Sequence, residues 1–521
     1  MLDYGAGNVR SVINALEKLG ESVRIVADAG DIVQAGRLVF PGVGSFGSMM
    51  EILREKGYIE PLQEYLRSGK PFFGICLGLQ ALFEKSEEAP GIPGLGIIPG
   101  EVRRFKVDLA VPHIGWNGIK VRQPSRIFHD IRGDEKFYFV HSYHVCPASE
   151  KPVLTTTDYG IEFVSAVQMG NLVATQFHPE KSGKPGLALL ENFLRDTREE
   201  VIPARCPETT RIAKRIIACL DVRSNDRGDL VVTKGDQYDV RENGNVRNLG
   251  KPVELAGRYY EEGADEITFL NITGFRDFPL KDMPMLEVLE RTSKNVFVPL
   301  TIGGGIRDYT DKDGRYYPAL EVASEYFRSG ADKISIGSDA VLIVEEVLRT
   351  GKTSGMSSIE QIARIYGNQA VVISVDPRRV YVETPEATPH PTIETAFPGP
   401  KGEQYCWYQC TIKGGREGRD LDAVTLARVC EQLGAGEILL NCIDRDGTNI
   451  GFDLELINAV RNAVTIPVIA SSGAGNPGHF LEVFTRTKAE AALAAGIFHR
   501  GEVSIGEVKA YLAGKVETRK I

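Results

Sequence analysis

The sequence predicts two α/β domains in one chain: a mixed α/β domain over residues 1–195 and a (β/α)8 barrel over residues 214–521. Three observations predict this fold class. The chain has 521 residues, which is too long for one ordinary hydrophobic core. In the first part, short apolar runs alternate with helical patterns. In the second part, eight apolar runs recur with helices between them, and the first four resemble the last four in order.

Composition and charge exclude several classes of protein. With 61 Lys and Arg against 70 Asp and Glu, the formal net charge is −9, and we expect no nucleic-acid partner. No apolar stretch reaches the ~18 residues of a membrane span, and no signal peptide is visible. The eight cysteines contain no CxxC pair, and Cys406 and Cys410 lack a nearby partner pair. This usage favours a reducing compartment and predicts neither a metal site nor a cofactor.

The first domain has strands and helices linked by glycine turns. In "MLDYGAGN" only Met1 and Leu2 precede the turn, so we expect that an upstream segment, such as a targeting sequence, was trimmed. "SVINALEKLG" predicts a helix that ends at Gly20. "RLVFPGVGSFG" predicts a strand and a glycine-rich loop, and "KPFFGICLGLQALF" predicts a strand, a turn and a helix. "KFYFVHSYHV" and "LVATQFHPEKSG" predict further strands with polar ends.

A charged segment with two prolines, residues 196–213, predicts the linker between the domains. The barrel strands are expected at residues 215–221, 266–271, 296–302, 333–337, 370–376, 437–443, 466–471 and 491–495. Residues 382–418, before a helix near 421–433, are rich in Pro, Gly and Thr and predict a long loop. A lid, a domain contact and a plain surface loop all remain open as its role.

The barrel half of the chain repeats itself. "IACLDVR" matches "VISVDPR", which places Asp221 over Asp376, and "GADEITFL" matches "GAGEILLN", which places Glu266 over Glu437. "VPLTIGGG" then matches "IPVIASSG", and "ADKISIGS" matches "AEAALAAG". A doubled four-strand unit that closes into one barrel explains four ordered matches better than chance.

Asp221 and Asp376 end the first and fifth strands, on opposite sides of the barrel mouth. Chemistry in such barrels takes place at the carboxyl ends of the strands. Two carboxylates that face one substrate from opposite sides suit a general acid and a general base. The alternative is that each Asp caps a helix or turn, but their twofold relation favours the catalytic interpretation.

Two pairs of glycine motifs predict two phosphate sites. "GGGI" and "GSDA" end strands three and four, and "SSGAG" and "AAGIF" end strands seven and eight. Glycine lets backbone N–H groups approach an anion, and a following helix N-terminus favours negative charge. The sequence therefore predicts a substrate with a phosphate at each end. Its candidate contacts are Gly304, Gly305, Gly337, Ser338, Asn441, Ser472, Gly473, Ala495 and Gly496.

The stretch "DRDGTNIGFDLE" has the acidic spacing of a calcium loop. We reject calcium because the glycine required at its sixth place is Asn449. Asp444, at the end of strand six, is expected to contact substrate instead.

"GICLG" has the spacing of a nucleophile on a sharp turn from strand to helix. Cys76 at its centre would point from the turn, next to a helix N-terminus that favours the thiolate. "QFHPEKS" supplies His178 as a base and Glu180, two residues on and on the same side of an extended chain, as its orienting group. A buried Cys and a surface His are the alternative when either motif is taken alone.

These motifs carry a family resemblance. "FPGVGSFG", "GICLGLQ" and "QFHPEKSG" resemble the class I glutamine amidotransferases. "YFVHSYH" and "PHIGWN" narrow this to the glutaminase part of the imidazole glycerol phosphate synthase family. "RIIACLDV", "VVTKGDQYDVR", "LTIGGGI" and "IPVIASSGAG" are similar to its cyclase part. The resemblance covers nearly the whole chain, and a single chain with both parts resembles the fungal and plant form.

The resemblance implies the activity. Cys76 would attack glutamine, with His178 and Glu180 completing a triad, and the released ammonia would pass through the barrel across an interface within the chain. At the mouth of the barrel, Asp221 and Asp376 would act on phosphoribulosyl-formimino aminoimidazole carboxamide ribotide, which carries two phosphates. The products would be imidazole glycerol phosphate and aminoimidazole carboxamide ribotide.

The resemblance also implies further site residues. The backbone of Gly42, Val43 and Gly44 would stabilise the oxyanion. Glutamine would be bound by Gln80, Glu88, Ser142 and Tyr143. Lys234 would lie near a phosphate. Arg215, Glu266, Lys333 and Glu437 would form a charged ring that gates ammonia, with a purely structural salt-bridge ring as the alternative.

Two rival functions would need other sequence features. An amidotransferase that uses ATP would need a nucleotide loop such as GxxxxGK[ST], and none is found. A scaffold that has lost activity would lack one of the four main catalytic candidates, and all are present. The compartment is expected to be the cytoplasm, or a plastid if a transit segment was removed.

Overall fold

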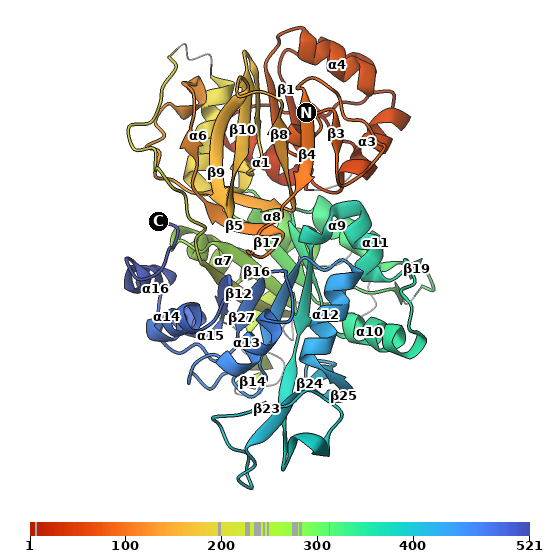
Figure 1. Cartoon of the computed structure of the whole chain (residues 1–521), viewed down its shortest axis with the longest axis vertical. Coiled ribbons are helices and arrows are strands. Elements are labelled where there is room, and N and C mark those ends of the chain that lie inside the picture. The colour runs from red at the N-terminus through yellow and green to blue at the C-terminus, as the bar shows by residue number, and fades with distance from the viewer. Residues whose placement is uncertain are drawn as a thin grey trace.

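The computed structural model describes residues 1–5, 8–195, 199–224, 230–233, 241–242, 245–246, 249–272, 280, 284–311 and 313–521. These residues form two lobes stacked along the long axis, with the N-terminal lobe at the top of Figure 1 and the barrel below it. No helix within the described ranges is long and apolar enough to cross a membrane.

A nine-stranded mixed sheet forms the centre of the N-terminal lobe. Its main path runs β1-β2-β11-β10-β8-β4-β3, and β9 and β6 extend it beside β10. The strands are β1 (Leu38–Gly42), β2 (Phe72–Cys76), β3 (Lys85–Ser86), β4 (Gly100–Arg104), β6 (Lys120–Val121), β8 (Tyr143–Pro147), β9 (Val153–Tyr159), β10 (Ile161–Met169) and β11 (Leu172–Thr175). The parallel strands β1, β2 and β11 are buried throughout, as apolar runs at the centre of an α/β sheet should be.

Helices cover both faces of this sheet. They are α1 (Val9–Lys18), α2 (Ala29–Gln34), α3 (Phe46–Glu55), α4 (Ile59–Arg67), α5 (Leu77–Gln80) and α6 (Gly183–Leu194), with the 3-10 turns η1 (Arg126–Phe128) and η2 (Pro179–Lys181). The predicted end of the first helix is confirmed: Gly20 has φ 89°, and its N–H donates to the Glu17 carbonyl at 3.0 Å. The start of the chain runs beside β1, because the Leu2 N–H donates to the Val39 carbonyl at 3.0 Å.

The second lobe is a closed parallel barrel, which confirms the predicted fold. Its eight strands are β12 (Arg215–Ser224), β16 (Glu266–Asn271), β17 (Leu300–Gly303), β20 (Lys333–Ile336), β21 (Val371–Val375), β26 (Glu437–Asn441), β27 (Val468–Ser471) and β28 (Ala491–Ala494). They pair in that order, and β28 pairs with β12 to close the sheet. The strands β12 and β21 are four positions apart, so Asp221 and Asp376 face each other across the mouth.

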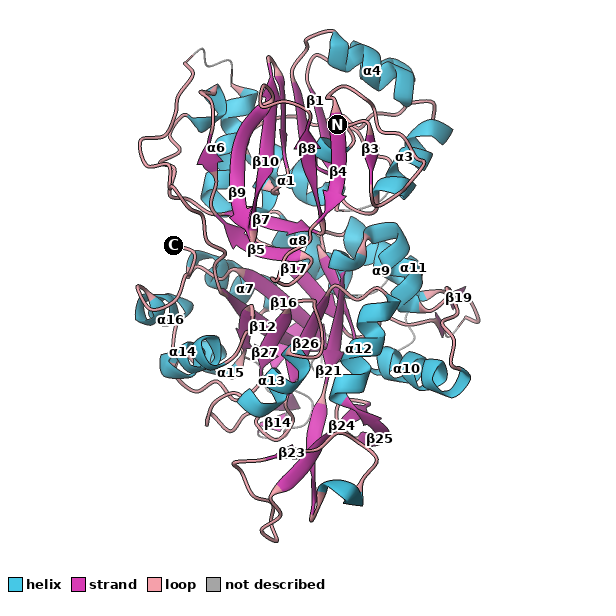
Figure 2. Ribbon diagram, viewed as in Figure 1, coloured by secondary structure: helices cyan, strands magenta, loops and turns pink. Residues whose placement is uncertain are grey.

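Helices surround the barrel, as Figure 2 shows. They are α7 (Pro252–Glu261), α8 (Pro284–Ser293), α9 (Ala319–Arg328), α10 (Ser338–Thr350), α11 (Ser358–Tyr366), α12 (Ala423–Leu433), α13 (Leu454–Arg461), α14 (Pro477–Arg486), α15 (Gly496–His499) and α16 (Ile505–Leu512). Smaller elements are β13 (Leu230–Thr233), β14 (Arg241–Glu242), β15 (Asn245–Val246), β18 (Tyr309–Thr310), β19 (Tyr316–Tyr317), η4 (Asn368–Ala370) and η5 (Pro385–Ala387).

The expectation of a loop over residues 382–418 is wrong in part. The chain there builds an antiparallel sheet from β22 (Pro377–Val382), β23 (Ile393–Glu394), β24 (Tyr405–Ile412) and β25 (Glu417–Asp422). The run of β24 forms a strand whose Cys406 and Cys410 side chains are buried. The Pro and Gly residues on either side of this run hide the strand pattern in the sequence. The sheet projects from the end of the barrel opposite the first lobe (Figure 2), so it makes no domain contact there.

A two-stranded ribbon, β5 (His113–Asn117) with β7 (Phe137–His141), lies between the lobes. Alternate side chains face opposite ways. Trp116 and Tyr138 join the core shared with the barrel, whereas Phe139 packs in the core of the first lobe. The Trp116 indole N–H donates to the Asp265 carbonyl of the barrel at 3.0 Å.

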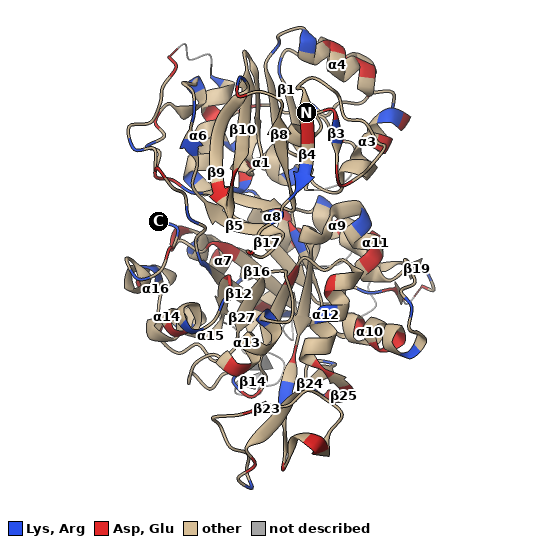
Figure 3. Cartoon of the chain, in the orientation of Figure 1, with Lys and Arg blue, Asp and Glu red and all other residues tan. Residues whose placement is uncertain are grey.

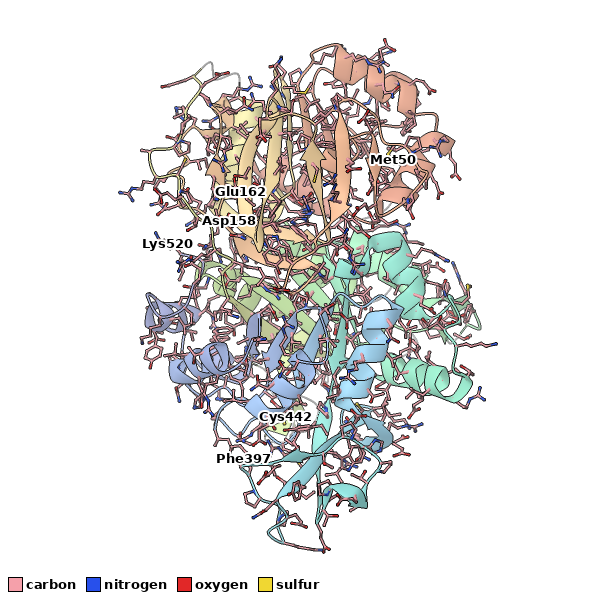
Figure 4. The ribbon with its side chains drawn as sticks, viewed as in Figure 1. Met50, Asp158, Glu162, Phe397, Cys442 and Lys520 are labelled. Atoms are coloured by element: carbon pink, nitrogen blue, oxygen red, sulfur yellow. The ribbon has the colours of Figure 1, made fainter. Side chains whose placement is uncertain are left out.

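Ion pairs also join the lobes. Lys181 Nζ lies 2.6 Å from Asp332 Oδ2. Lys520, near the C-terminus at the junction of the two lobes (Figure 4), pairs with Asp134 at 2.8 Å. The first lobe therefore sits on the amino-terminal ends of the barrel strands.

Candidate active sites

Cys76 occupies a strained turn between β2 and α5. Its backbone has φ 53° and ψ −102°, a conformation that L residues rarely adopt. A Cβ on Gly78 would lie 2.2 Å from the Phe40 carbonyl oxygen, and one on Gly74 would lie 2.8 Å from the Gly78 carbonyl oxygen. Both glycines are therefore required for the turn, and strain at such a site points to function.

His178 and Glu180 come together as the sequence predicts. His178 Nδ1 lies 2.7 Å from Glu180 Oε1, and both side chains are buried. The His178 backbone N–H donates to the Tyr138 carbonyl at 2.9 Å, which ties the ring to the domain interface. Burial alone would lower the pKa of His178, but the charges of Glu180 and Cys76 hold it well above its usual range. A protonated imidazole beside a thiol favours the thiolate nucleophile.

The segment expected to stabilise the oxyanion begins at Gly42, the last residue of β1. The N–H of its central residue, Val43, already has a hydrogen-bond partner. The Val43 N–H donates to Tyr4 Oη at 3.1 Å, and the same hydroxyl donates to the Val43 carbonyl at 2.5 Å. A Cβ on Gly44 would lie 2.7 Å from the Ile365 carbonyl oxygen of the barrel. Gly42 packs against Leu77 on the Cys76 turn. Gly42 is in register with Cys76 between β1 and β2, whereas the Val43 N–H points to Tyr4.

Two of the four residues expected to contact glutamine, Gln80 and Tyr143, are hydrogen-bonded to each other. Gln80 Nε2 donates to the Tyr143 carbonyl at 3.3 Å, and Gln80 Oε1 is buried without a hydrogen-bond partner among the described residues. Burial raises the pKa of Glu88 to about 7. The hydrogen bond that its carboxylate accepts from the Phe46 N–H lowers the pKa, but by less. Ser142 Oγ contacts Asn368 of the barrel at 3.5 Å.

Sequence reasoning missed Gln176. Its Nε2 donates to Cys76 Sγ at 3.4 Å. The available signal was its place two residues before His178, which on an extended chain puts both side chains on one side.

Four charged side chains form a closed ring at the amino-terminal end of the barrel. Each is the first residue of its strand: Arg215, Glu266, Lys333 and Glu437. Lys333 Nζ lies 2.7 Å from a carboxylate oxygen of both Glu266 and Glu437. Arg215 lies 2.8 Å from Glu266 and also pairs with Glu437. None of the four is exposed. Burial tends to lower the pKa of Arg215, but the two glutamates raise it above its usual range.

Asp221 and Asp376 line one cavity of about 240 Å³ at the barrel mouth. Asp376 Oδ1 accepts hydrogen bonds from Asn441 Nδ2 at 2.7 Å and from Ser374 Oγ at 3.4 Å. Burial raises the pKa of Asp376 more than these two hydrogen bonds lower it. This environment shifts the Asp376 carboxyl group toward its neutral form compared with an exposed aspartate.

The phosphate candidates from the second half of the barrel line the same cavity: Asn441, Ser472, Gly473, Ala495 and Gly496. Ser472 has φ 73°, and a Cβ on Gly473 would lie 2.3 Å from the Gly451 carbonyl oxygen. The tight backbone that the glycine motif predicts is therefore present there.

The candidates from the first half, Gly304, Gly305, Gly337 and Ser338, are not among the residues that line this cavity. Ser338 begins α10, and its hydroxyl accepts a hydrogen bond from the Lys413 N–H at 3.1 Å. Lys234 lies outside the described residues.

Asp446, rather than Asp444, lines the cavity. Asp444 instead accepts a hydrogen bond from the Arg379 backbone N–H at 2.7 Å, which fastens the loop after β26 to β22. Asp444, which the sequence predicted as a substrate contact, is therefore not among the residues that line this cavity.

Comparison with known proteins accounts for both lobes. Residues 1–197 match the family model described as glutamine amidotransferase class-I, and residues 215–504 match the one described as histidine biosynthesis protein. The chloroplastic imidazole glycerol phosphate synthase of Arabidopsis thaliana is 59% identical over 519 residues, covering 98% of this chain and 88% of that protein. The chain belongs to the imidazole glycerol phosphate synthase family.

Two fungal relatives are nearly as similar. The imidazole glycerol phosphate synthase of Schizosaccharomyces pombe is 57% identical over 531 residues, covering 98% of both chains. That of Emericella nidulans is 56% identical over 537 residues, covering 98% of this chain and 97% of the relative. The family resemblance expected from the motifs is confirmed, and with it the single-chain form that carries both domains.

Basic and acidic residues are interspersed along the chain in both lobes of the molecule (Figure 3). A mixed distribution of charge suits an enzyme of small substrates.

Proposed function

We propose that the chain hydrolyses glutamine in its first domain and uses the ammonia in the barrel. There ammonia would convert phosphoribulosyl-formimino aminoimidazole carboxamide ribotide into imidazole glycerol phosphate and aminoimidazole carboxamide ribotide. The observation that carries this proposal is the placement of the two sites at opposite ends of the barrel. The Cys76 site lies on the end of the barrel closed by the charged ring, while Asp221 and Asp376 line a cavity at the other end.

In the first domain, the Cys76 thiolate attacks the side-chain carbonyl carbon of glutamine. The C–N bond then breaks, and the amide nitrogen takes a proton from His178 and leaves as ammonia, which gives a thioester. His178 takes a proton from water, whose oxygen attacks the thioester and releases glutamate. Glu180 holds the imidazole through its 2.7 Å contact and stabilises its protonated form. The Val43 N–H would have to leave Tyr4 to stabilise the oxyanion.

The charged ring is proposed as the ammonia gate. Ammonia is uncharged and small, so it can pass if the ion pairs of Lys333 separate briefly. A buried ring of charges has a large desolvation cost and would not be needed for packing alone.

At the barrel mouth, Asp376 is proposed as the general acid and Asp221 as the general base. Burial raises the pKa of Asp376, and this is the direction of shift that a general acid requires. Two phosphates of the substrate would bind at the glycine motifs after strands three and four and after strands seven and eight.

The domain boundaries are proposed at residues 1–195 and 214–521, with the linker at 196–213. A cytoplasmic location is proposed, or a plastid one if a transit segment precedes the chain. The Arabidopsis relative carries the description chloroplastic.

The test is glutamate release from glutamine with and without the ribotide, for the unmodified chain and for Cys76→Ala, with a control fed with ammonium. The proposal expects release to rise with the ribotide, to vanish in Cys76→Ala, and ring closure in that variant to be restored by ammonium. Glutamate release by Cys76→Ala, or release indifferent to the ribotide, would overturn it.

A further inference from the structure

Gln176 is a fully buried side chain beside the nucleophile to which the mechanism above gives no role. Its Nε2 donates to Cys76 Sγ at 3.4 Å, and its Oε1 accepts from Gln80 Nε2 at 3.2 Å. Its backbone N–H donates to the Ser165 carbonyl at 2.8 Å, which fixes the residue to β10. Each end of the Gln176 amide therefore has one defined partner.

Gln80 is oriented in the same way. Its amide nitrogen uses both hydrogens, one toward Gln176 Oε1 and one toward the Tyr143 carbonyl at 3.3 Å. Its Oε1 is left buried without a hydrogen-bond partner in the described part of the chain. Buried polar atoms are nearly always partnered, so this oxygen points to a group that arrives with a ligand.

The Tyr143 carbonyl has a second donor, His141 Nδ1, at 2.7 Å. Burial lowers the pKa of His141 to about 3, so the ring is neutral and its proton is on Nδ1. His141 Nε2 must then accept, and His113 Nδ1 donates to it at 3.1 Å. His113 is buried as well, and its pKa is well below the usual range for the same reason.

The histidine pair is held by aromatic rings. His113 stacks on Tyr159 with ring centres 3.9 Å apart and on Phe139 with ring centres 4.8 Å apart. Together these contacts make a continuous hydrogen-bonded relay from His113 through His141, the Tyr143 carbonyl and the amides of Gln80 and Gln176 to the Cys76 sulfur. Every donor in it has a single possible direction.

We propose that Gln176 is a positioning residue of the glutaminase site. Its amide N–H holds and stabilises the Cys76 thiolate, and its amide oxygen turns Gln80 so that Gln80 Oε1 faces the substrate's N–H donors. The His113–His141 pair anchors the other end of the relay. The inference deepens the proposed function and rests on its assignment of Cys76 as the nucleophile. A hydrogen bond from an amide to a thiolate favours the charged form, which is the reactive one.

The test compares Gln176→Glu, which keeps the size and one acceptor but removes the donor, with Gln176→Met, which removes both. Gln168→Met is the matched control, because Gln168 lies in the same lobe and its side-chain amide donates to the Gly170 carbonyl at 3.2 Å rather than to Cys76. The measurements are the rate of alkylation of Cys76 by iodoacetamide, followed on its own peptide, and kcat and KM for glutamine. Ring closure fed with ammonium shows that the whole chain is folded.

For both Gln176 variants we expect alkylation of Cys76 to slow about 10-fold and kcat/KM for glutamine to fall about 100-fold, in line with the loss of one donor at a reacting centre. Ring closure from ammonium should stay within about twofold of the control, because the barrel site is untouched. His141→Leu should raise KM for glutamine more than it slows alkylation, because it acts through Gln80. His141→Asn, whose amide can reach the same carbonyl, should recover part of the loss.

Alkylation and kinetics of Gln176→Glu equal to those of Gln168→Met would overturn the proposal and leave Gln176 as a packing residue. The same conclusion follows if the Gln176→Glu chain alone alkylates normally, since that variant is isosteric and should fold. Glutamate release that persists in Cys76→Ala would instead contradict the nucleophile assignment, and so the proposed function itself.

Discussion

The glutaminase site and the cyclase site are assembled in different ways. Cys76, His178 and Glu180 come from two short segments and are only 5%, 4% and 3% exposed. Asp221 and Asp376 come from opposite strands of a closed sheet and line a cavity of about 240 Å³. The first site is enclosed, and the Val43 N–H proposed to stabilise the oxyanion is bound to Tyr4. The second opens at the mouth of the barrel.

This difference indicates which of the two sites can be regulated by a change in conformation. An enclosed site with an engaged oxyanion donor needs a movement before glutamine reacts. The backbone of β7 offers a route for it, because the Tyr138 carbonyl holds His178 while the Tyr138 side chain packs in the core shared with the barrel. The open site needs only its substrate and ammonia.

The largest expected effect is at the open site. Asp376→Asn should reduce ring closure about 1,000-fold with either glutamine or ammonium, because general acid catalysis contributes on the order of 100- to 10,000-fold. Glutamate release without the ribotide should be unchanged. Ring closure is measured by product formation from the ribotide. Equal loss of basal glutamate release would show that the two sites are not separate.

Glu180→Gln tests how the enclosed site keeps the His178 imidazole protonated. Glu180 holds the pKa of His178 above its usual range, so the imidazole keeps its proton as pH rises. Without that charge the pKa of His178 falls, and the alkaline limb of the pH–rate profile for glutamate release should move to lower pH. The rate should fall about 100-fold. A profile that keeps its shape would contradict the role of Glu180, and ammonium-fed ring closure is the control.

Lys333→Met tests the boundary between the two sites. It removes one of the two buried cations that pair with both Glu266 and Glu437 and leaves only Arg215, so the free energy of unfolding should fall by roughly 3–5 kcal/mol. Denaturation in urea measures this. We also expect glutamine hydrolysis to exceed product formation, because an opened ring lets ammonia or water leak. One glutamate per product in this variant would argue for a purely structural ring.

The smallest effect is expected for Tyr4→Phe. It removes the hydroxyl that accepts from the Val43 N–H at 3.1 Å and frees that donor for the oxyanion. Basal glutamate release should rise about 3- to 10-fold, the worth of one ordinary hydrogen bond. Release that falls would mean that Tyr4 supports the active arrangement and does not oppose it.

The sequence predicted what local spacing or symmetry encodes. The turn at Cys76 follows from two glycines that leave no room for a Cβ, and the pair Asp221 and Asp376 follows from the internal repeat. The charged ring was placed by the family resemblance, and each member proves to be the first residue of a strand.

What the sequence hid depends on contacts between distant segments. Asp446 and not Asp444 lines the cavity, because the Asp444 carboxylate accepts a hydrogen bond from the Arg379 backbone N–H instead. The strands within 382–418 were missed because Pro and Gly surround the apolar run of β24. The engagement of Val43 by Tyr4 joins residues 39 positions apart and leaves no local pattern.

The central claim is that ammonia travels inside the molecule from the enclosed site to the open one. The most direct measurement supplies glutamine labelled with nitrogen-15 in its side-chain amide, the ribotide and an excess of unlabelled ammonium, and follows the isotope in imidazole glycerol phosphate. The account predicts that nearly all the product carries nitrogen-15. Product labelled in proportion to the bulk ammonium pool would show that ammonia escapes to solvent first, and would contradict the account.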